Sequence, residues 1–388
     1  MRIISMYIYR EITTHLEKLS RMFPVVLVTG PRQSGKSTLV KQLFQSHVYV
    51  NMESPKEREM ARADAESFLA RGNMIIDEVQ RTPELLEYIQ SIVDSKKVKG
   101  QFILTGSNQP ELFEKVSESL AGRAGIAELL PLSFSELANA GFDVSNRDVS
   151  LCRGFMPGHF ADGIETEALY SSYFRTYVER DVRKLVNISD LDLFETFVQL
   201  LAGRVGQLVN KQSLAKDVGV SEMTIARWIT LLRTSYIIFP LRPFYNNFGK
   251  RITKTSKIYF VDTGLVAYLL GIRSPLEMAT HPLMGNLFEN MVVADAFKER
   301  FNSGRRPNLF FYRNSSGSVE VDLLCEDGEH LDAYEIKASS TFSEKMTRSL
   351  KLFAAVANNV RQSTVIYSGS TLLPLAVNFK PESVKVSA

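Results

Sequence analysis

The chain has 388 residues, 45% of them hydrophobic and 23% charged, a balance typical of soluble globular proteins. This length allows about two or three domains, each with its own core. The formal net charge of +3 excludes a uniformly basic protein, so any contact with nucleic acid must come from local patches. The two cysteines, Cys152 and Cys325, lack ligand spacing, which fits a reduced compartment. Without a membrane-length apolar run or a signal-peptide pattern, we expect a cytoplasmic protein with no membrane partner.

The first third of the chain alternates between helical and strand patterns. An amphipathic helix is expected within residues 1–23, with Ile12, Leu16 and Leu19 on one face. Short apolar runs predict strands at 25–29, 48–52, 74–77, 102–106 and 126–130. This alternation predicts a parallel, doubly wound sheet in an α/β domain that spans residues 1–135.

The segment Gly30-Pro-Arg-Gln-Ser-Gly-Lys-Ser37 matches the phosphate-loop pattern G-x-x-x-x-G-K-[ST] between an expected strand and an expected helix. The glycines let successive backbone N–H groups point at phosphates, at the positive end of the helix. We expect Lys36 to reach the β- and γ-phosphates of ATP and Ser37 to ligate Mg²⁺; the alternative is a chance glycine turn. The predicted nucleotide contacts are Gly30, Pro31, Arg32, Gln33, Ser34, Gly35, Lys36, Ser37 and Thr38.

Two further strands end in polar residues. Asp77 and Glu78 close the run Asn73-Met-Ile-Ile-Asp-Glu78, where Asp77 would hold Mg²⁺ through water and Glu78 would polarise the attacking water. A plain strand terminus is the alternative. The next strand ends at Ser107 and Asn108, either of which could sense the γ-phosphate; Asn108 is preferred, and a tight turn remains open.

The middle of the chain is predominantly helical. Residues 136–205 carry helical periodicity over 165–184 and 192–201. Residues 211–232 predict a helix–turn–helix, with Gly219 at the turn and Ser221 as the second N-cap. Expected strands at 236–239 and 257–262 would form a wing, which predicts a winged-helix module over residues 206–275.

The expected winged helix offers two candidate surfaces for DNA. Its second helix presents Ser221, Thr224 and Arg227, a sparse set for base readout. The basic stretch contains Lys250, Arg251, Lys254 and Lys257, with Tyr245 and Phe248 nearby, and could follow phosphates. Trp228, Ile225 and Leu231 fit a core better than a stacking surface.

The chain resembles a prokaryotic family of AAA+-type ATPases whose C-terminal domain is of unknown function. Besides the phosphate loop, the segments that carry the resemblance are Ile76-Asp-Glu-Val-Gln-Arg-Thr-Pro-Glu84, Leu120-Ala-Gly-Arg123, Tyr177-Val-Glu-Arg-Asp181, Ala202-Gly-Arg204 and Lys257-Ile-Tyr-Phe-Val-Asp-Thr-Gly264. The resemblance covers nearly the whole chain. It implies a P-loop ATPase core, a helical lid, a winged helix and a restriction-endonuclease-like α/β domain at 276–388.

The resemblance also implies a homo-oligomeric ring. Arg123 would then complete a neighbouring subunit's ATP site, with an ordinary ion-pairing arginine as the alternative. Arg204 would be a nucleotide sensor on the lid, and Arg32 a structural or interfacial residue.

Four residues of the C-terminal segment resemble the PD-(D/E)XK nuclease constellation. Glu289 lies on an expected helix, Asp322 on one strand, and Glu335 and Lys337 on the next, where spacing of two gives one face. Asp322 and Glu335 would be hard oxygen ligands for Mg²⁺, while Lys337 would position a water. Val321 replaces the proline of the pattern, which leaves cleavage open. The alternative is the solvated face of a sheet.

Two functions therefore remain open. The chain is either an ATP-driven enzyme that acts on DNA, or a nucleotide-gated switch whose C-terminal domain binds a protein partner. The basic stretch and the intact acidic set favour the first, while the low net charge and the sparse recognition helix favour the second.

Overall fold

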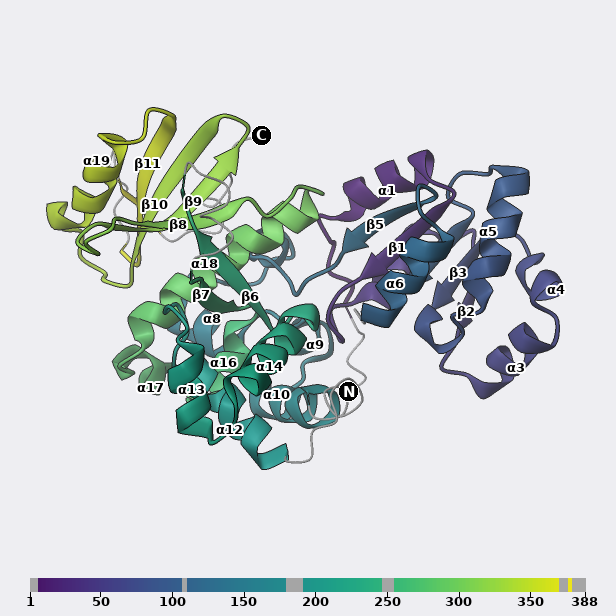
Figure 1. Cartoon of the computed structure of the whole chain (residues 1–388), viewed down its shortest axis with the longest axis horizontal. Coiled ribbons are helices and arrows are strands. Elements are labelled where there is room, and N and C mark those ends of the chain that lie inside the picture. The colour runs from purple at the N-terminus through teal and green to yellow at the C-terminus, as the bar shows by residue number, and fades with distance from the viewer. Residues whose placement is uncertain (1–5, 107–109, 179–190, 246–254, 370–375, 379–388) are drawn as a thin grey trace.

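The computed structural model describes residues 6–106, 110–178, 191–245, 255–369 and 376–378. It contains two separate sheets at opposite sides of the molecule, with most of the remaining helices between and below them (Figure 1). Among the described helices, none is both long and apolar enough to cross a bilayer.

The first sheet has five strands in the order β2-β3-β4-β1-β5, and all four pairings are parallel. This confirms the expected parallel α/β sheet and inserts β4 between β1 and β3. Its elements are α1 (Thr13–Met22), β1 (Val25–Thr29), α2 (Lys36–Leu43), β2 (Val48–Asn51), α3 (Pro55–Ala63), α4 (Ala65–Leu69), β3 (Met74–Asp77), a 3-10 turn (Val79–Arg81), α5 (Leu85–Lys96), β4 (Phe102–Thr105), α6 (Pro110–Ser119) and β5 (Ala124–Glu128).

Helices cover both faces of this sheet because strand β1, like its neighbours, is apolar on both sides. Val25 and Leu27 pack with α4, α5 and α6, whereas Val26 and Val28 pack with α1 and α2. The predicted apolar face of α1 is buried as expected. The carboxyl ends of the strands therefore meet at one edge, next to the phosphate loop.

The helices that follow share one hydrophobic core, which continues into the C-terminal segment. The helix predicted over 165–184 ends as an α-helix at Tyr173, and one π-helical turn follows it. The elements are α7 (Phe134–Asn139), α8 (Arg147–Arg153), α9 (Pro157–Asp162), α10 (Thr166–Tyr173), the π turn (Phe174–Val178), α12 (Leu191–Ala202), α13 (Lys211–Val218), α14 (Glu222–Thr234), α16 (Thr263–Leu269) and α17 (Pro275–Thr280).

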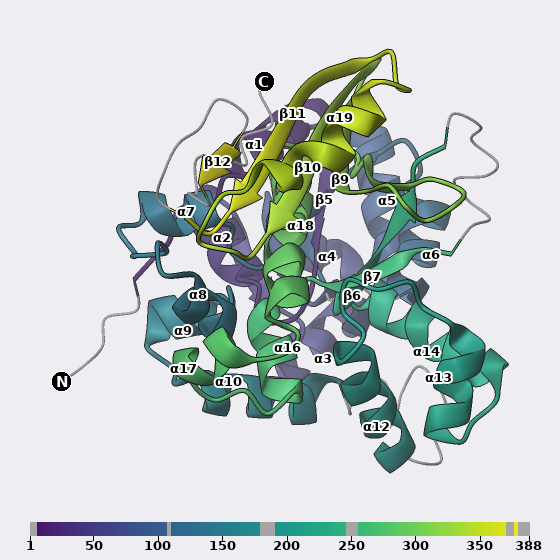
Figure 2. The ribbon, with the colours of Figure 1, turned by 90° about the vertical axis from the view of Figure 1, so that its left-hand side faces the viewer.

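The second sheet has seven strands in the order β12-β11-β10-β9-β8-β6-β7. The long helix α18 packs against β10 and β7 (Figure 2), and α19 packs against β9, β10 and β11. The elements are β6 (Ile238–Pro243), β7 (Lys257–Phe260), α18 (Met284–Asn302), β8 (Leu309–Arg313), β9 (Glu320–Asp327), β10 (His330–Lys337), a 3-10 turn (Glu344–Thr347), α19 (Arg348–Ala354), β11 (Val360–Tyr367) and β12 (Ala376–Asn378).

The two strands expected to form a free-standing wing belong to this second sheet. β6 pairs antiparallel with β7, and its last residues, Arg242 and Pro243, pair in parallel with Phe310 and Phe311 of β8. The sequence prediction missed this because β6 is six residues long, so it extends beyond the hairpin to reach β8. The strands that follow the helix–turn–helix are thus part of the C-terminal sheet.

Candidate nucleotide site and C-terminal acidic site

The phosphate loop runs from β1 into α2 through left-handed backbone. Gly30 has φ of 138°, and a Cβ there would lie 2.1 Å from the Leu129 carbonyl oxygen. Gln33 also has positive φ, and Gly35, at 93°, is the N-cap of α2. No larger residue fits at position 30, which explains why the motif begins with glycine.

Lys36 lies under the curve of this loop. Its Nζ donates to the carbonyl oxygens of Gly30 at 3.1 Å and Pro31 at 2.7 Å, and the side chain is buried. Burial lowers the pKa of Lys36 to about 8, although the charges of Glu78 and Asp77 oppose the shift. An anionic ligand in the loop would offset this cost of burial.

Asp77 ends β3 with both carboxylate oxygens engaged. Oδ2 accepts from the Tyr49 hydroxyl at 2.6 Å, and Oδ1 accepts from the Thr105 hydroxyl. Neither Tyr49 nor Thr105 was predicted from the sequence. Tyr49 lies on β2 and Thr105 on β4, and both contact Asp77 because these strands flank β3, an order that the sequence does not reveal. Glu78 follows in left-handed conformation, with φ of 59°, and its N–H donates to Thr105 Oγ1 at 3.3 Å.

A cavity of about 750 Å³ lies between this edge of the sheet and helices α9 and α10. One side is polar and carries most of the predicted phosphate and metal residues, namely Arg32, Gln33, Gly35, Lys36, Ser37, Thr38, Asp77 and Glu78. The predicted contacts Gly30, Pro31 and Ser34 do not line the cavity. The other side is largely apolar and aromatic, with Tyr7, Ile8, Ile164, Leu169 and Tyr173. A triphosphate end and a base end are therefore distinguishable, and the donor set fits Mg²⁺–ATP.

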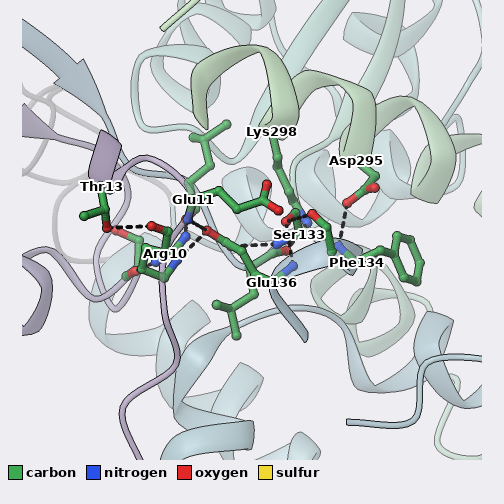
Figure 3. Close-up of polar contacts among 12 residues, drawn as sticks. Arg10, Glu11, Thr13, Ser133, Phe134, Glu136, Asp295 and Lys298 are labelled. Carbon is green, nitrogen blue, oxygen red and sulfur yellow. Dashed lines mark hydrogen bonds and ion pairs between the residues drawn. The ribbon is translucent and has the colours of Figure 1, made fainter. Parts of the chain in front are cut away.

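Arg10 lines the cavity and bonds to the phosphate loop and to Glu136, a role the sequence did not signal; Figure 3 shows it beside Glu136. Its Nη1 donates to the Ser34 carbonyl at 2.7 Å, its Nη2 to the Leu130 carbonyl at 2.7 Å, and its Nε to Glu136 Oε1 at 3.0 Å. Glu136 also completes a capping box with Ser133 at the start of α7. A lone arginine before a helix gives no local pattern, so only the folded structure identifies it.

The remaining predicted ATPase residues lie away from the cavity or outside the described residues. Ser107 and Asn108 belong to the latter group. Arg123 precedes β5 at the amino edge of the sheet and binds both carboxylate oxygens of Asp94. Arg204 binds Asp217 at 2.5 Å and the Leu200 carbonyl. Neither arginine lines the cavity.

The four C-terminal residues come together at the junction of α18, β9 and β10. Lys337 Nζ lies 2.7 Å from Glu335 Oε1 and 3.0 Å from Asp322 Oδ2, and the Ile336 N–H also donates to Asp322 Oδ2. Glu335 Oε2 is buried and has no hydrogen-bond partner among the residues that the structure describes. Burial, followed by the nearby charge of Asp322, raises the pKa of Glu335 to about 7.

Glu289 enters from α18 and is held by residues of β7. It accepts from Lys257 Nζ at 3.0 Å and from the Tyr259 hydroxyl at 2.5 Å, and Lys257 also pairs with Glu320 at 2.6 Å. Burial raises the pKa of Glu289 to about 7, with Asp322 adding to the shift and Lys257 opposing it. No set of three or more acidic, histidine or cysteine ligands in the described part of the chain has metal-binding geometry.

The predicted basic stretch is therefore wrong at Lys257. This residue is 5% exposed and neutralises two carboxylates, so it cannot follow a phosphate backbone. Lys250, Arg251, Lys254 and Phe248 lie outside the described residues. Trp228 is buried and packs with Phe194 and Phe197, as expected for a core residue.

Family models and known proteins match most of the chain. Residues 22–138 match a model described as an AAA domain, while 147–276 and 284–381 match two models described as domains of unknown function. Uncharacterized proteins of Mycobacterium tuberculosis and Mycobacterium bovis are each 31% identical over 373 residues, which is 95% of this chain and 81% of theirs. An uncharacterized Haemophilus influenzae protein is 27% identical over 64% of this chain and 69% of its own. A solved Walker-type ATPase of Pyrococcus abyssi shares 16% identity over 67% of this chain and 94% of its own, with a TM-score of 0.44.

Proposed function

This chain belongs to the same protein family as the uncharacterized mycobacterial proteins and carries an AAA-type P-loop ATPase domain, and we propose that it is a Mg²⁺-dependent ATPase that acts on DNA. The observation that carries the proposal is the single cavity shared by the phosphate loop, Asp77 and Glu78. We assign residues 1–135 to the ATPase core, 136–205 to a helical lid, 206–275 to a winged helix and 276–388 to a nuclease-like domain.

In the proposed ATPase site the loop amides and Lys36 bind the phosphates, while Ser37 and Asp77 hold Mg²⁺, Asp77 through water. Bound Mg²⁺ neutralises charge on the β- and γ-phosphate oxygens. Glu78 orients and polarises the attacking water, which is consistent with its left-handed backbone and its place in the cavity wall. Asn108 is proposed as the γ-phosphate sensor.

Oligomerisation into a ring would give Arg123 a role that it cannot have in its own subunit. It precedes β5 at the edge opposite the phosphate loop, so it could reach only a neighbour's nucleotide. Release from Asp94 would be required first. We propose Arg123 as the arginine finger and Arg204, which is bound to Asp217 of α13, as a nucleotide sensor on the lid.

Action on DNA is supported by the helix–turn–helix of α13 and α14 and by the acidic site of the C-terminal sheet. Asp322 and Glu335 have the chemistry to hold Mg²⁺, and the unpartnered Glu335 Oε2 is the atom that a cation would satisfy. Lys337 would position the attacking water, and Glu289 would support the site from α18.

A second candidate function is a nucleotide-gated switch that binds a protein partner without cleaving DNA. The position of Lys337 favours it, because its ammonium group already lies between Asp322 and Glu335. In that case the acidic site would be an internal ion-pair cluster.

The direct test is ATP turnover with and without Mg²⁺ in the presence of single-stranded, duplex or branched DNA. We expect turnover that requires Mg²⁺, is lost in Lys36→Ala and is stimulated by at least one form of DNA. Turnover that survives Lys36→Ala would contradict the assigned site. Turnover indifferent to all three forms would favour the switch.

The two functions differ at Glu335. Under the DNA-processing function, Glu335→Gln removes divalent-dependent cleavage while ATP turnover persists, because the two sites are far apart. Under the switch, neither wild type nor variant cleaves any of the DNA forms.

A further inference from the structure

A second large hollow lies outside both sites described above, where helices α13 and α14 face strand β6 and the segment that leads into β7. Its volume is about 840 Å³. Three cationic side chains line it, Lys211, Arg233 and Arg242, against one acidic residue, Glu222. All three cations are exposed, and within the described residues none of them has an ion pair.

The hollow continues along the edge of the second sheet. An adjoining hollow of about 490 Å³ shares Leu208 and Thr255 with it and is lined further along by Arg313 and the turn 314–317. The two form one groove, which we call the basic groove, from the helix–turn–helix to the β8–β9 turn. Its cations come from α13, α14 and β6, which are consecutive in the chain, and from β8, about 70 residues further on.

We propose that the basic groove binds the sugar–phosphate backbone of DNA, an inference that rests on the proposed action on DNA and specifies where contact occurs. Four cationic side chains and one acidic side chain line the groove, so its charge is complementary to phosphate. Neutral donors accompany the cations: Gln212, Thr230, Thr255 and Ser256. Such donors contact phosphate and sugar oxygens without regard to base sequence.

This surface differs from the one that the sequence favoured. The groove is lined by the face of α14 that carries Glu222, Ala226, Thr230 and Arg233, whereas Arg227 does not line it. Arg227 is thus expected to have little part in binding. Contact through the groove would not require α14 to enter the major groove as a reading helix.

The groove also leads toward the C-terminal acidic site. Thr255 and Ser256 line its floor, and the next residue, Lys257, binds Glu289 and Glu320. Glu320 in turn lies 3.6 Å from Arg313, which lines the far part of the groove. DNA in the groove would therefore lie directly beside the residues that hold Glu289.

The experiment compares the full chain with two triple variants of equal charge. The groove variant is Lys211→Gln, Arg233→Gln and Arg242→Gln, and the control is Lys56→Gln, Lys96→Gln and Lys99→Gln on the exposed surface of the ATPase domain. Binding of a fluorescein-labelled 30-base-pair duplex of mixed sequence is followed by anisotropy at several salt concentrations. Arg227→Gln is measured in parallel.

We expect the groove variant to bind on the order of a hundredfold more weakly at low salt, because three phosphate contacts are lost. Each lost contact also removes about 0.9 from the magnitude of the slope of log affinity against log salt. The slope should fall by about 3, while the control and Arg227→Gln keep the wild-type slope. Equal loss in groove and control variants, or a loss confined to Arg227→Gln, would overturn the groove as the contact. If the wild-type chain binds no DNA at all, the proposed action on DNA fails instead, and the inference fails with it.

Discussion

Arg10 and Glu136 form an ion pair, 3.0 Å from Nε to Oε1, in which the side chains are only 4% and 0% exposed. The pair joins the phosphate loop, through the Ser34 carbonyl, to the start of α7. The start of α7 and the residue two positions before it bond to α18: the Phe134 N–H donates to Asp295, and Lys298 donates to the Leu132 carbonyl (Figure 3). The nucleotide site is thereby connected, through Arg10 and Glu136, to the helix that carries Glu289.

Replacing Arg10 with methionine should destabilise the protein by about 3–5 kcal/mol, because the buried Glu136 carboxylate loses its cationic partner and keeps only its bonds to the Glu11 and Ser133 N–H groups. The double variant Arg10→Met, Glu136→Gln should recover part of this loss, since it removes the buried charge as well. Chemical denaturation of the four members of this cycle measures the coupling. Additive losses would mean that the two residues act independently.

Where Arg10→Met remains folded, its effect on ATP should also be measurable. The Ser34 carbonyl loses its donor, so the loop is less preorganised and KM for ATP should rise by more than kcat falls. Arg10→Lys, which keeps one charged donor, should restore KM in part. A variant that is merely less stable would leave KM unchanged at temperatures where it is folded.

The carboxylate of Glu78 should affect hydrolysis and not binding. Glu78→Gln is expected to reduce kcat by about 10²–10⁴-fold, the usual contribution of general base catalysis, with ATP affinity near that of wild type. Lys36→Ala should instead weaken ATP binding itself. Measuring the binding of a fluorescent ATP analogue alongside turnover separates the two effects. An equal loss of binding in both variants would contradict the assignment of Glu78 to hydrolysis and Lys36 to binding.

The ATPase site could be predicted from the sequence to a large extent because its residues are local. The motif at 30–37 is contiguous and follows β1, and Asp77 and Glu78 lie at the end of β3, so the shared carboxyl edge of a parallel sheet is enough to bring them together. Arg10, Tyr49 and Thr105 were missed because each depends on which segments become neighbours in space. Neither the hydrophobic periodicity nor the spacing of motifs indicates which segments become neighbours in the folded protein.

Lys257 is the converse case, a residue that the sequence predicted as a phosphate contact and that the structure buries. Among the basic residues from 250 onward it gave a plausible phosphate-binding stretch, but pairing of β7 with β6 directs it toward Glu289 and Glu320. Charge in a sequence does not reveal whether the side chain is exposed. The acidic set itself was anticipated because Asp322 and Glu335 lie on strands joined by a short turn.

Lys257→Met should accordingly destabilise the fold by about 3–5 kcal/mol, because two carboxylates lose their buried partner. Adding Glu289→Gln should restore part of the stability, and urea denaturation of the single and double variants tests this. If Lys257 contacted phosphate instead, its replacement would weaken DNA binding and leave the free energy of unfolding nearly unchanged.

Asp295 should make stability depend on pH. Burial raises the pKa of its carboxyl group to about 7, against an ordinary value near 4, while the charge of Lys298 opposes the shift. Between these two values the folded protein binds a proton that the unfolded chain has lost, so this group's contribution to stability falls as pH rises from about 4 to about 7, and is constant above. Asp295→Asn keeps an oxygen to accept from the Phe134 N–H but cannot ionise.

The free energy of unfolding of Asp295→Asn, relative to that of wild type, should therefore rise by on the order of 2–4 kcal/mol between pH 4.5 and pH 7.5. It should rise no further above about pH 8. The comparison is made by urea denaturation at each pH, with the exposed Asp192→Asn as the control that shares the charge change. A difference that stays constant with pH would show that Asp295 is ionised in the folded protein throughout this range. The charge of the nearby Lys298 would then keep the Asp295 carboxylate ionised against the cost of its burial.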